Sequence, residues 1–275
     1  MGPDRPLTGL RVVDTVGLRG ELCGRLLADL GAEVVRVEPP GGGPTRAHAP
    51  STAGESLAFA IRNMNKTGAV LDLSGSGAAA DADRERFRSM LAGADVWVDD
   101  ARPGERDVVE LDPESVSAAF PRLTITSITD FGHTGPYRDR VATNDVMVGM
   151  AWMLFKAGTT EWPPVLPPGS LAYDIAGITA AFATIAGHLR AREKGQGGWI
   201  DCSVMESVAQ TTDWGLAGRP VDVAAGDPDP AEIRSGAGPV YPIVRCADGW
   251  VRPSVVSIAE WHKMREWLGD PPELQ

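Results

Sequence analysis

The sequence predicts an α/β protein in which a Rossmann-like, doubly wound parallel sheet is followed by the start of a smaller α+β domain. Three observations support this fold class. Short apolar segments alternate with helical segments through the first half of the chain, which is the order expected of parallel strands joined by crossover helices. The apolar segments are nearly continuous, as in strands buried on both faces. Towards the C-terminus the pattern changes to a hairpin and one helix.

The first half of the chain contains five predicted strands with helices between them. Gly31 is the expected end of the first helix, because glycine readily adopts the left-handed conformation that follows a helix. The prolines and glycines of residues 39–43 break the chain after the second strand. We expect strands at residues 10–16, 32–38, 68–73, 95–98 and 123–129, and helices at residues 21–30, 79–91 and 112–119.

A long helix dominates the second half, from residue 171 to about residue 194. Six large apolar residues recur there at alternating spacings of four and three, which is an apolar stripe with helical periodicity. An apolar helix precedes it at residues 145–155, and a strand and a helix follow at residues 199–204 and 205–216. The stripe consists of Leu171, Ile175, Ile178, Phe182, Ile185 and Leu189.

Residues 217–237 are rich in proline, aspartate, glycine and alanine, and we interpret them as a linker. The chain then divides into a large domain at residues 1–216 and a smaller unit at residues 238–275. The smaller unit contains a predicted hairpin, with strands at residues 240–246 and 250–256, and a helix at residues 259–268. It is too short to bury a core of its own, so we expect it to be the start of a domain that is truncated here.

The composition excludes several classes of partner. The 275 residues include 26 Lys and Arg against 37 Asp and Glu, a formal net charge of −11, which disfavours nucleic acid and anionic membranes. Three distant cysteines do not suggest a disulfide framework, and the four histidines lack metal-ligand spacing. No signal peptide or sufficiently long apolar segment is evident. We therefore expect a cytoplasmic protein that binds no metal and neither nucleic acid nor membrane.

The first predicted strand and helix are joined by a glycine-containing turn, with Gly17, Gly20 and Gly24. A dinucleotide-binding turn would have the spacing G-x-G-x-x-G, which these glycines do not match. Glu38 ends the second strand, where an acidic residue could hold a ribose. Close packing of helix against strand explains the glycines better than an NAD site does.

Basic residues lie near the ends of the predicted strands, where open α/β sheets bind their ligands. Arg36, Lys66, Arg102 and Arg140 are the main candidates for binding an anionic ligand such as a polyphosphate. The alternative is a set of ordinary surface charges, and on this pattern alone the alternative is favoured.

Asp174 falls in the first turn of the long predicted helix. A carboxylate at such a junction could act as a nucleophile. Acidic residues are also common in first turns because they stabilise the helix, and the local pattern alone favours that interpretation. Gly236 and Gly238 could form a mobile lid, or a turn before the hairpin; the turn is the simpler interpretation.

Many short motifs recur in a fixed order along nearly the whole chain. They are 6–14 (PLTGLRVVD), 26–39 (LLADLGAEVVRVEP), 63–66 (NMNK), 71–73 (LDL), 94–96 (ADV), 102–104 (RPG), 131–137 (FGHTGPY), 195–203 (GQGGWIDCS), 206–207 (ES), 241–242 (YP) and 247–249 (ADG), with Asp174 before an Ala-Gly pair. In this order and spacing the chain resembles the family III CoA-transferases, the CaiB/BaiF family. The family includes formyl-CoA and carnitine-CoA transferases and α-methylacyl-CoA racemases.

The resemblance implies a CoA-binding large domain, a smaller domain and a homodimer of interlocked chains. It implies that Asp174 is the catalytic aspartate, which attacks the thioester of an acyl-CoA and passes through a mixed anhydride and an aspartyl-CoA thioester. Lys66, Arg102 and Arg140 match positions that hold the CoA phosphates or line its path, and the strand-end pattern adds Arg36. The loop of Gly236 and Gly238 would shield the anhydride from water.

Differences from the family decide between its activities. Racemases have a histidine where this chain has Asn144, and a glutamate near the position of Ala259. Without an imidazole acid–base partner, α-proton transfer lacks half of its machinery. An acyl-CoA:carboxylate CoA-transferase is therefore favoured over a racemase. A third alternative is a non-catalytic CoA-binding subunit of a hetero-oligomer, because the chain is shorter than its family and has Asp99-Asp100-Ala101 in place of the usual Glu-Asn-Phe.

Overall fold

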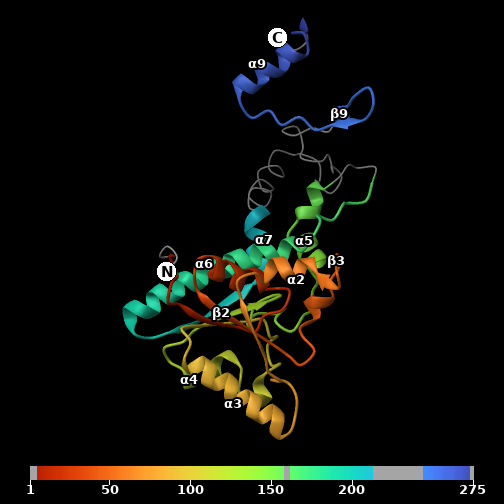
Figure 1. Ribbon diagram of the computed structural model, residues 1–275. Coiled ribbons are helices and arrows are strands. Elements are labelled where there is room, and N and C mark those ends of the chain that lie inside the picture. Colours follow the sequence, from red (N-terminus) through yellow and green to blue (C-terminus); the bar gives the residue numbers. More distant parts are fainter. Residues whose placement is uncertain (1–4, 158–161, 213–243, 273–275) are drawn as a thin grey trace. The chain divides into compact units, whose positions relative to one another are not determined.

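The computed structural model describes residues 5–157, 162–212 and 244–272 (Figure 1). The chain forms two compact units. The first comprises Met1–Met147 and Gly169–Thr211, and the second comprises Val148–Pro168 and Thr212–Gln275. Residues 148–168, which the sequence analysis assigns to the large domain, are thus grouped with the second unit. The predicted linker lies outside the described residues.

The first unit is built on a six-stranded sheet with the strand order β5-β2-β1-β6-β7-β8. All five neighbouring pairs are parallel. In chain order this is the 3-2-1-4-5-6 arrangement of Rossmann folds, with its switch point between β1 and β6. The predicted fold class is confirmed for this unit. The strands are β1 (Arg11–Asp14), β2 (Glu33–Glu38), β5 (Thr67–Val70), β6 (Val96–Asp99), β7 (Thr124–Thr129) and β8 (Gly198–Ser203).

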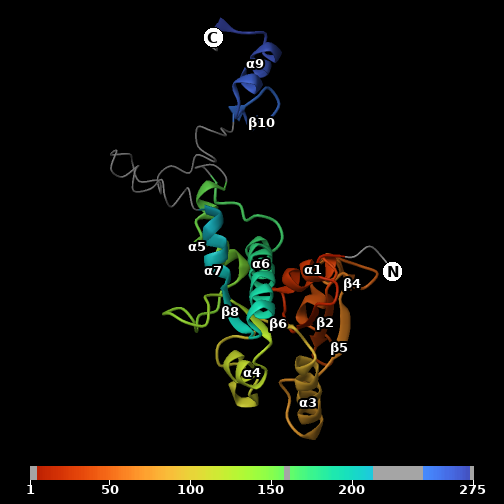
Figure 2. The same ribbon diagram turned by 90° about the vertical axis from the view of Figure 1, so that its left-hand side faces the viewer.

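Helices cover both faces of the sheet (Figures 1 and 2). Helices α1 (Glu21–Asp29) and α6 (Leu171–Lys194) pack on one face and against each other, whereas α3 (Ala78–Ala92) and α4 (Pro113–Ala119) cover the other. The remaining elements are short: α2 (Leu57–Arg62), α5 (Asn144–Met150), α7 (Val204–Ala209), β3 (Ser51–Thr52), β4 (Glu55–Ser56), and 3-10 turns at Pro44–Ala47, Asp107–Val109, Met153–Lys156 and Gln210–Thr212.

Two predicted helices are shorter than the sequence suggests. The apolar helix expected at residues 145–155 ends at Met150 and is followed by a 3-10 turn. The break occurs because Trp152 adopts a left-handed conformation, with φ of 64°, which no α-helix can include. In the described part of the helix expected at residues 205–216, the α-helix ends at Ala209 and a 3-10 turn follows at Gln210–Thr212. Residues 213–216 lie outside the described ranges.

The largest side chains of the core lie under α3 and α4. Trp97 of β6 and Phe87 of α3 are fully buried and meet edge to face, with ring centroids 5.7 Å apart. The indole N–H of Trp97 donates to the hydroxyl oxygen of Thr15 at 2.9 Å. This bond joins β6 to the loop after β1, so the core supports the carboxyl edge of the sheet at its switch point.

The opposite face is packed with small residues, and this reverses the pattern expected of α6. Its buried side includes Ala172, Ala176, Gly177, Ala180 and Ala181. Half of the predicted apolar stripe is exposed: Ile178 is 55%, Phe182 75% and Leu189 57% accessible, whereas Leu171, Ile175 and Ile185 are partly buried. A Cβ atom on Gly177 would lie 2.9 Å from the Cβ of Leu22. The small side of the helix faces inward because α1 approaches too closely for larger side chains.

The described part of the second unit contains a short hairpin and one helix. Strands β9 (Val244–Arg245) and β10 (Trp250–Val251) pair antiparallel, and α9 (Ile258–Trp267) follows. Ser257 and Glu260 form a capping box that fixes the start of α9. Across the described residues, every helix is too short or too polar to cross a membrane.

Candidate active site

Asp174 lies in the first turn of α6, and its side chain is 35% accessible. Its carboxylate accepts hydrogen bonds from the guanidinium group of Arg62. Nε of Arg62 donates to Oδ1 at 3.1 Å, and Nη2 donates to Oδ1 at 2.9 Å and to Oδ2 at 3.0 Å. Arg62 was not among the residues predicted from the sequence, and it is separated from Asp174 by 112 positions. No local motif connects the two residues.

Asn144 supports the start of α6. Its side-chain oxygen accepts a hydrogen bond from the backbone N–H of Ala172 at 2.9 Å. This N–H belongs to the first turn of the helix, where backbone donors have no partner within the helix. Asn144 therefore fixes the turn from which Asp174 projects. Its amide N–H donates to Asp145 at 2.9 Å, so both ends of the amide are in use.

Arg62 is the last residue of α2, and both ends of this short helix are anchored. The hydroxyl oxygen of Ser56 accepts from the backbone N–H of Phe59 at 3.1 Å and caps the helix. At the other end, Oδ1 of Asn63 accepts from Arg36 and from Lys66, each at 2.9 Å. These contacts hold the backbone next to Arg62 against the sheet.

Arg36 and Lys66, two predicted CoA-binding residues, lie together in a buried ionic network. The ammonium group of Lys66 is 2.7 Å from Oδ2 of Asp14, and the guanidinium group of Arg36 is 2.9 Å from Oε1 of Glu21. Their side chains are 1% and 5% accessible. All four charges are paired, as buried charges must be. The network connects β1, β2 and α1 to the segment after α2, which gives both basic residues a structural role; their part in CoA binding stays a prediction.

Close packing accounts for the glycines at the first βα turn. A Cβ atom on Gly24 would lie 2.1 Å from Oδ2 of Asp14, so any side chain there would disrupt the pair with Lys66. The carboxylate of Glu38 is occupied by Arg46, whose Nη2 lies 2.6 Å from Oε2, and by the N–H of Gly43. Burial opposes the charge of Glu38, but these hydrogen bonds outweigh it and lower its pKa. Glu38 is thus already bonded within the protein rather than open to a ribose.

Two adjacent carboxyl groups follow β6 at the switch point of the sheet. Asp99 is buried and accepts from the hydroxyl group of Thr15 at 2.8 Å and pairs with Arg106 at 2.7 Å. Asp100 lies 3.7 Å from Arg19 and has a side chain that is 14% accessible. Burial, and next the neighbouring Asp99, raise the pKa of Asp100 to about 7.

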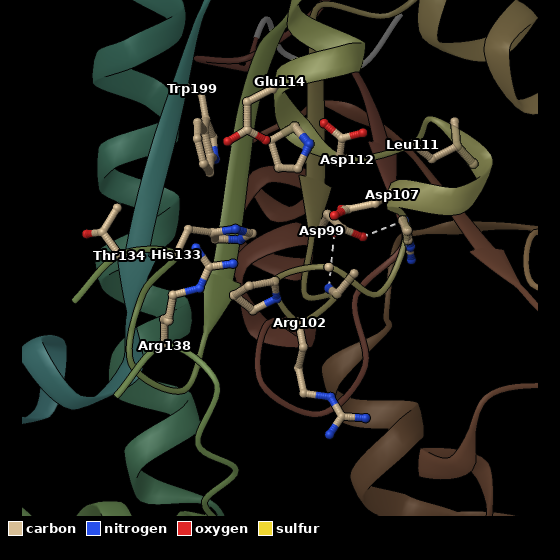
Figure 3. A pocket seen from close by; sticks show the side chains of 15 residues that line it. Asp99, Arg102, Asp107, Leu111, Asp112, Glu114, His133, Thr134, Arg138 and Trp199 are labelled. Carbon is tan, nitrogen blue, oxygen red and sulfur yellow. Dashed lines mark hydrogen bonds and ion pairs between the residues drawn. The ribbon is translucent and has the colours of Figure 1, made fainter. Parts of the chain in front are cut away.

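A cavity of about 470 Å³ opens between the loops after β6 and β7 and the start of α4 (Figure 3). Its lining carries positive charges from Arg102, Arg106 and Arg138 and negative charges from Asp99, Asp107, Asp112 and Glu114. His133 is 9% accessible, and within the described part of the chain its Nε2 has no hydrogen-bond partner. The cavity is thus lined by groups that can bind both a phosphate and a polar heterocycle.

Only some of the site residues predicted from the sequence line this cavity. Arg102 lines the cavity, and Arg140 is exposed beyond the residues that line it. Arg138, which the sequence analysis did not select, lines the cavity instead; it is the first basic residue after the Gly-Pro-Tyr motif, a signal that could have identified it. Gly236 and Gly238 lie outside the described residues.

The two buried cysteines, Cys23 and Cys202, are poor candidates for a nucleophile. All three cysteines are free thiols. Burial raises the pKa of Cys23 to about 12, and burial also raises the pKa of Cys202, so both remain protonated at neutral pH. Within the described residues, no cluster of three or more potential metal ligands occurs.

Comparisons with known proteins show the family to which the chain belongs. The family described as CoA-transferase family III matches residues 7–275. The chain belongs to this family. It is 38% identical over 255 residues to the "Probable CoA-transferase Rv1866" of Mycobacterium tuberculosis, a match that covers 91% of this chain and 31% of that protein. It is 35% identical to the "Acetyl-CoA:oxalate CoA-transferase" of Acetobacter aceti, over 74% of this chain and 52% of that enzyme.

A solved structure of the same family has the same fold. The CaiB/BaiF family protein from Brucella suis superposes with a TM-score of 0.81 at 27% identity, over 97% of this chain and 70% of that one. The chain of this family III member spans about a third to a half of the length of the two curated relatives named above.

Proposed function

We propose that this family III CoA-transferase moves CoA from an acyl-CoA to a carboxylate, with Asp174 as the nucleophile. The observation that carries the proposal is the partly exposed carboxylate of Asp174, held at the start of α6 by Arg62. The resemblance to the family implies that this is the position of its catalytic aspartate. Relatives named as CoA-transferases for oxalate and for benzylsuccinate support the reaction class.

The proposed chemistry proceeds through two kinds of covalent intermediate. A carboxylate oxygen of Asp174 bonds to the thioester carbonyl carbon, and the C–S bond breaks to give a mixed anhydride and CoA thiolate. The thiolate then attacks the aspartyl carbonyl carbon and displaces the donor carboxylate, leaving an aspartyl-CoA thioester. The acceptor carboxylate then attacks the carbonyl carbon of the aspartyl thioester, which forms a second mixed anhydride and releases CoA thiolate. The thiolate attacks the acceptor's carbonyl carbon in that anhydride, which yields the new acyl-CoA and releases the Asp174 carboxylate. Each step exchanges one leaving group for another and consumes no oxidant or reductant.

Positive residues beside the carboxyl edge of the sheet supply the proposed CoA site. Arg102 and Arg138 line the same cavity, and a nucleotide with three phosphate groups requires several such donors. His133, with its unpartnered Nε2, provides a polar contact for the heterocycle. Arg140 lies in the same loop as Arg138. Arg36 and Lys66 belong to the buried ionic network beside the first βα turn, and they stay predicted CoA-binding residues. The loop of Gly236 and Gly238 is proposed to shield the anhydride.

The proposal includes an oligomer in the cytoplasm. Ile178, Phe182 and Leu189 form an exposed apolar row on α6, larger than isolated surface residues explain. A second chain covering this row, either another copy or a related subunit, would bury it. One relative is named as a CoA-transferase "subunit" and another as a "beta subunit". The free cysteines suit a reducing compartment.

Racemase chemistry is the less favourable alternative. It needs an acid–base pair on either side of the α-carbon. Asn144, at the position of the racemase histidine, is a neutral amide that holds the backbone of α6. Ala259, at the start of α9, has no ionisable group.

A transfer assay tests the proposal. Purified protein is mixed with succinyl-CoA or acetyl-CoA and a panel of carboxylates, and new acyl-CoA species are measured by mass spectrometry. We expect transfer by the wild-type chain and a loss of at least about a thousandfold in Asp174→Asn, because the amide is not a nucleophile. CoA binding without transfer would instead support a non-catalytic subunit. Exchange of α-hydrogen for deuterium would support the racemase.

A further inference from the structure

Arg62 has no role in the proposed chemistry so far, yet it makes three hydrogen bonds to the carboxylate of Asp174. We propose that Arg62 is the carboxylate-binding residue of the reaction: it holds Asp174 in the free enzyme and holds the substrate carboxylate once Asp174 has become a thioester. This inference rests on the proposed function, because it assigns the recognition of the acceptor at the same site.

The burial of the pair shows which partner is the fixed one. The side chain of Arg62 is 14% accessible, whereas that of Asp174 is 35% accessible. The guanidinium group is thus the more enclosed member, and the carboxylate faces the solvent from which a substrate arrives. An enclosed guanidinium group without an anion is unfavourable, because its lost hydration is not replaced.

The surroundings of Arg62 keep it in place when its partner changes. The carbonyl oxygen of Ile61 accepts a hydrogen bond from Arg25, and Asn63 is held by Arg36 and Lys66. The residues on both sides of Arg62 are therefore tied to other elements. Its side chain can stay directed at the site while Asp174 reacts.

Charge then determines what Arg62 binds at each stage. When the carboxyl group of Asp174 is esterified to CoA through sulfur, it loses its negative charge, whereas a guanidinium group keeps its positive charge in proteins. At that stage the other reactant is itself a carboxylate. The planar fork of arginine binds any carboxylate through paired N–H donors. Arg62 can thus exchange one carboxylate for another, so that it has an anionic partner both in the free enzyme and at the aspartyl-thioester stage.

The alternative is that Arg62 only tethers Asp174. The two roles differ in the behaviour of a variant with a neutral residue at position 174. Asp174→Asn resembles the thioester state in having no negative charge at position 174, but it forms no covalent bond. If Arg62 receives the substrate, this variant gains a vacant carboxylate site; if Arg62 only tethers, it gains none.

The first experiment measures binding of succinate by calorimetry, with succinamide as the neutral analogue. We expect Asp174→Asn to bind succinate at least about tenfold more tightly than the wild type, a difference typical of charge-assisted hydrogen bonds. Succinamide should show no such gain. The gain should vanish in the double variant Asp174→Asn with Arg62→Gln, and persist when Arg86→Gln, a change on the distant helix α3, replaces Arg62→Gln. Circular dichroism establishes that each variant is folded.

The second experiment uses the active enzyme. Arg62→Gln should raise the KM for the acceptor carboxylate by about tenfold or more and change the KM for acyl-CoA by less than about threefold. Arg62→Lys should recover part of the loss, because it restores the charge but not the fork. Equal succinate affinity in wild type and Asp174→Asn would overturn the role of Arg62. A wild type without transfer activity would refute the proposed function instead, and the binding experiment would still decide the role of Arg62.

Discussion

Individual residues in this protein owe their roles to partners that are distant in sequence. Arg36 and Lys66 have the charge and position expected of phosphate ligands, but they are paired with Glu21 and Asp14 inside the fold. Arg62, which carries no recognisable motif, contacts the predicted nucleophile. A sequence pattern reports the charge of a residue and its place along a strand. It does not report which opposite charge the fold brings to it.

At the residue scale, the titration of Asp100 predicts that the stability of the protein depends on pH. Its pKa of about 7 in the folded protein, caused by burial and by Asp99, exceeds the value of about 3.9 in unfolded chains. The unfolded state therefore loses this proton first as the pH rises, and the free energy of unfolding decreases between about pH 4 and pH 7. Asp100→Asn removes this titration. We expect the variant to be more stable than the wild type at pH 8, by up to about 4 kcal/mol for a pKa difference of about three, and nearly equal to it below about pH 4.

Urea denaturation at pH 5 and pH 8 measures the free energy of unfolding of both proteins. The stability gained by Asp100→Asn should be larger at pH 8 than at pH 5. Asp139→Asn is a suitable control, because Asp139 is exposed with a side chain that is 81% accessible. A stability difference of the same size at both pH values would contradict this account of Asp100.

Helix α6 shows what periodicity predicts at the scale of an element. Its spacing correctly predicted a helix at Leu171–Lys194, because apolar residues three and four positions apart lie on one face. The same spacing did not predict which face is buried. Alanine and glycine have little hydrophobic surface, yet they permit the closest approach of α1, and the large residues are left outside. Inter-helix distance decided the outcome, and no single segment encodes it.

Gly177 is the test of this close packing. A methyl group there would lie 2.9 Å from the Cβ of Leu22 and 3.3 Å from the backbone nitrogen of Cys23. Alanine is the better helix former by about 1 kcal/mol, but forcing α1 and α6 apart should cost more. We expect Gly177→Ala to lower the free energy of unfolding by a net amount of about 1–2 kcal/mol. Thermal unfolding followed by circular dichroism measures it.

Gly68→Ala is the matched control, since no atom lies within 4 Å of the added methyl group. It should change the melting temperature little. A Gly177→Ala variant as stable as the wild type would show that α1 and α6 can separate without loss.

At the scale of the whole molecule, the strand order of the first unit follows from features that the sequence displays openly. Buried parallel strands are short, continuous apolar runs, and right-handed crossovers leave few topologies to choose from. The exposed row on α6 and the distribution of cavity-lining residues depend on how distant segments meet. Those features required the three-dimensional structure.

The exposed row predicts a change of assembly state. Phe182 is 75% accessible, so Phe182→Glu should leave each folded chain intact while placing a charge where a second chain is proposed to pack. We expect the wild type to have at least the mass of a dimer by light scattering, and the variant to have the mass of a monomer. Val108→Glu, at an apolar residue that is 94% exposed outside the row, should keep the wild-type mass. A monomeric wild type, or an unchanged Phe182→Glu assembly, would argue against an interface at this row.

The covalent role of Asp174 is tested most directly by trapping its thioester. The protein is incubated with succinyl-CoA in the absence of an acceptor, treated with borohydride and digested, and the peptides are analysed by mass spectrometry. Borohydride reduces an aspartyl thioester to the alcohol, so the account predicts homoserine at position 174 in the wild type. If the chain transfers CoA while Asp174 is recovered unmodified, the nucleophile lies elsewhere and the central claim is wrong.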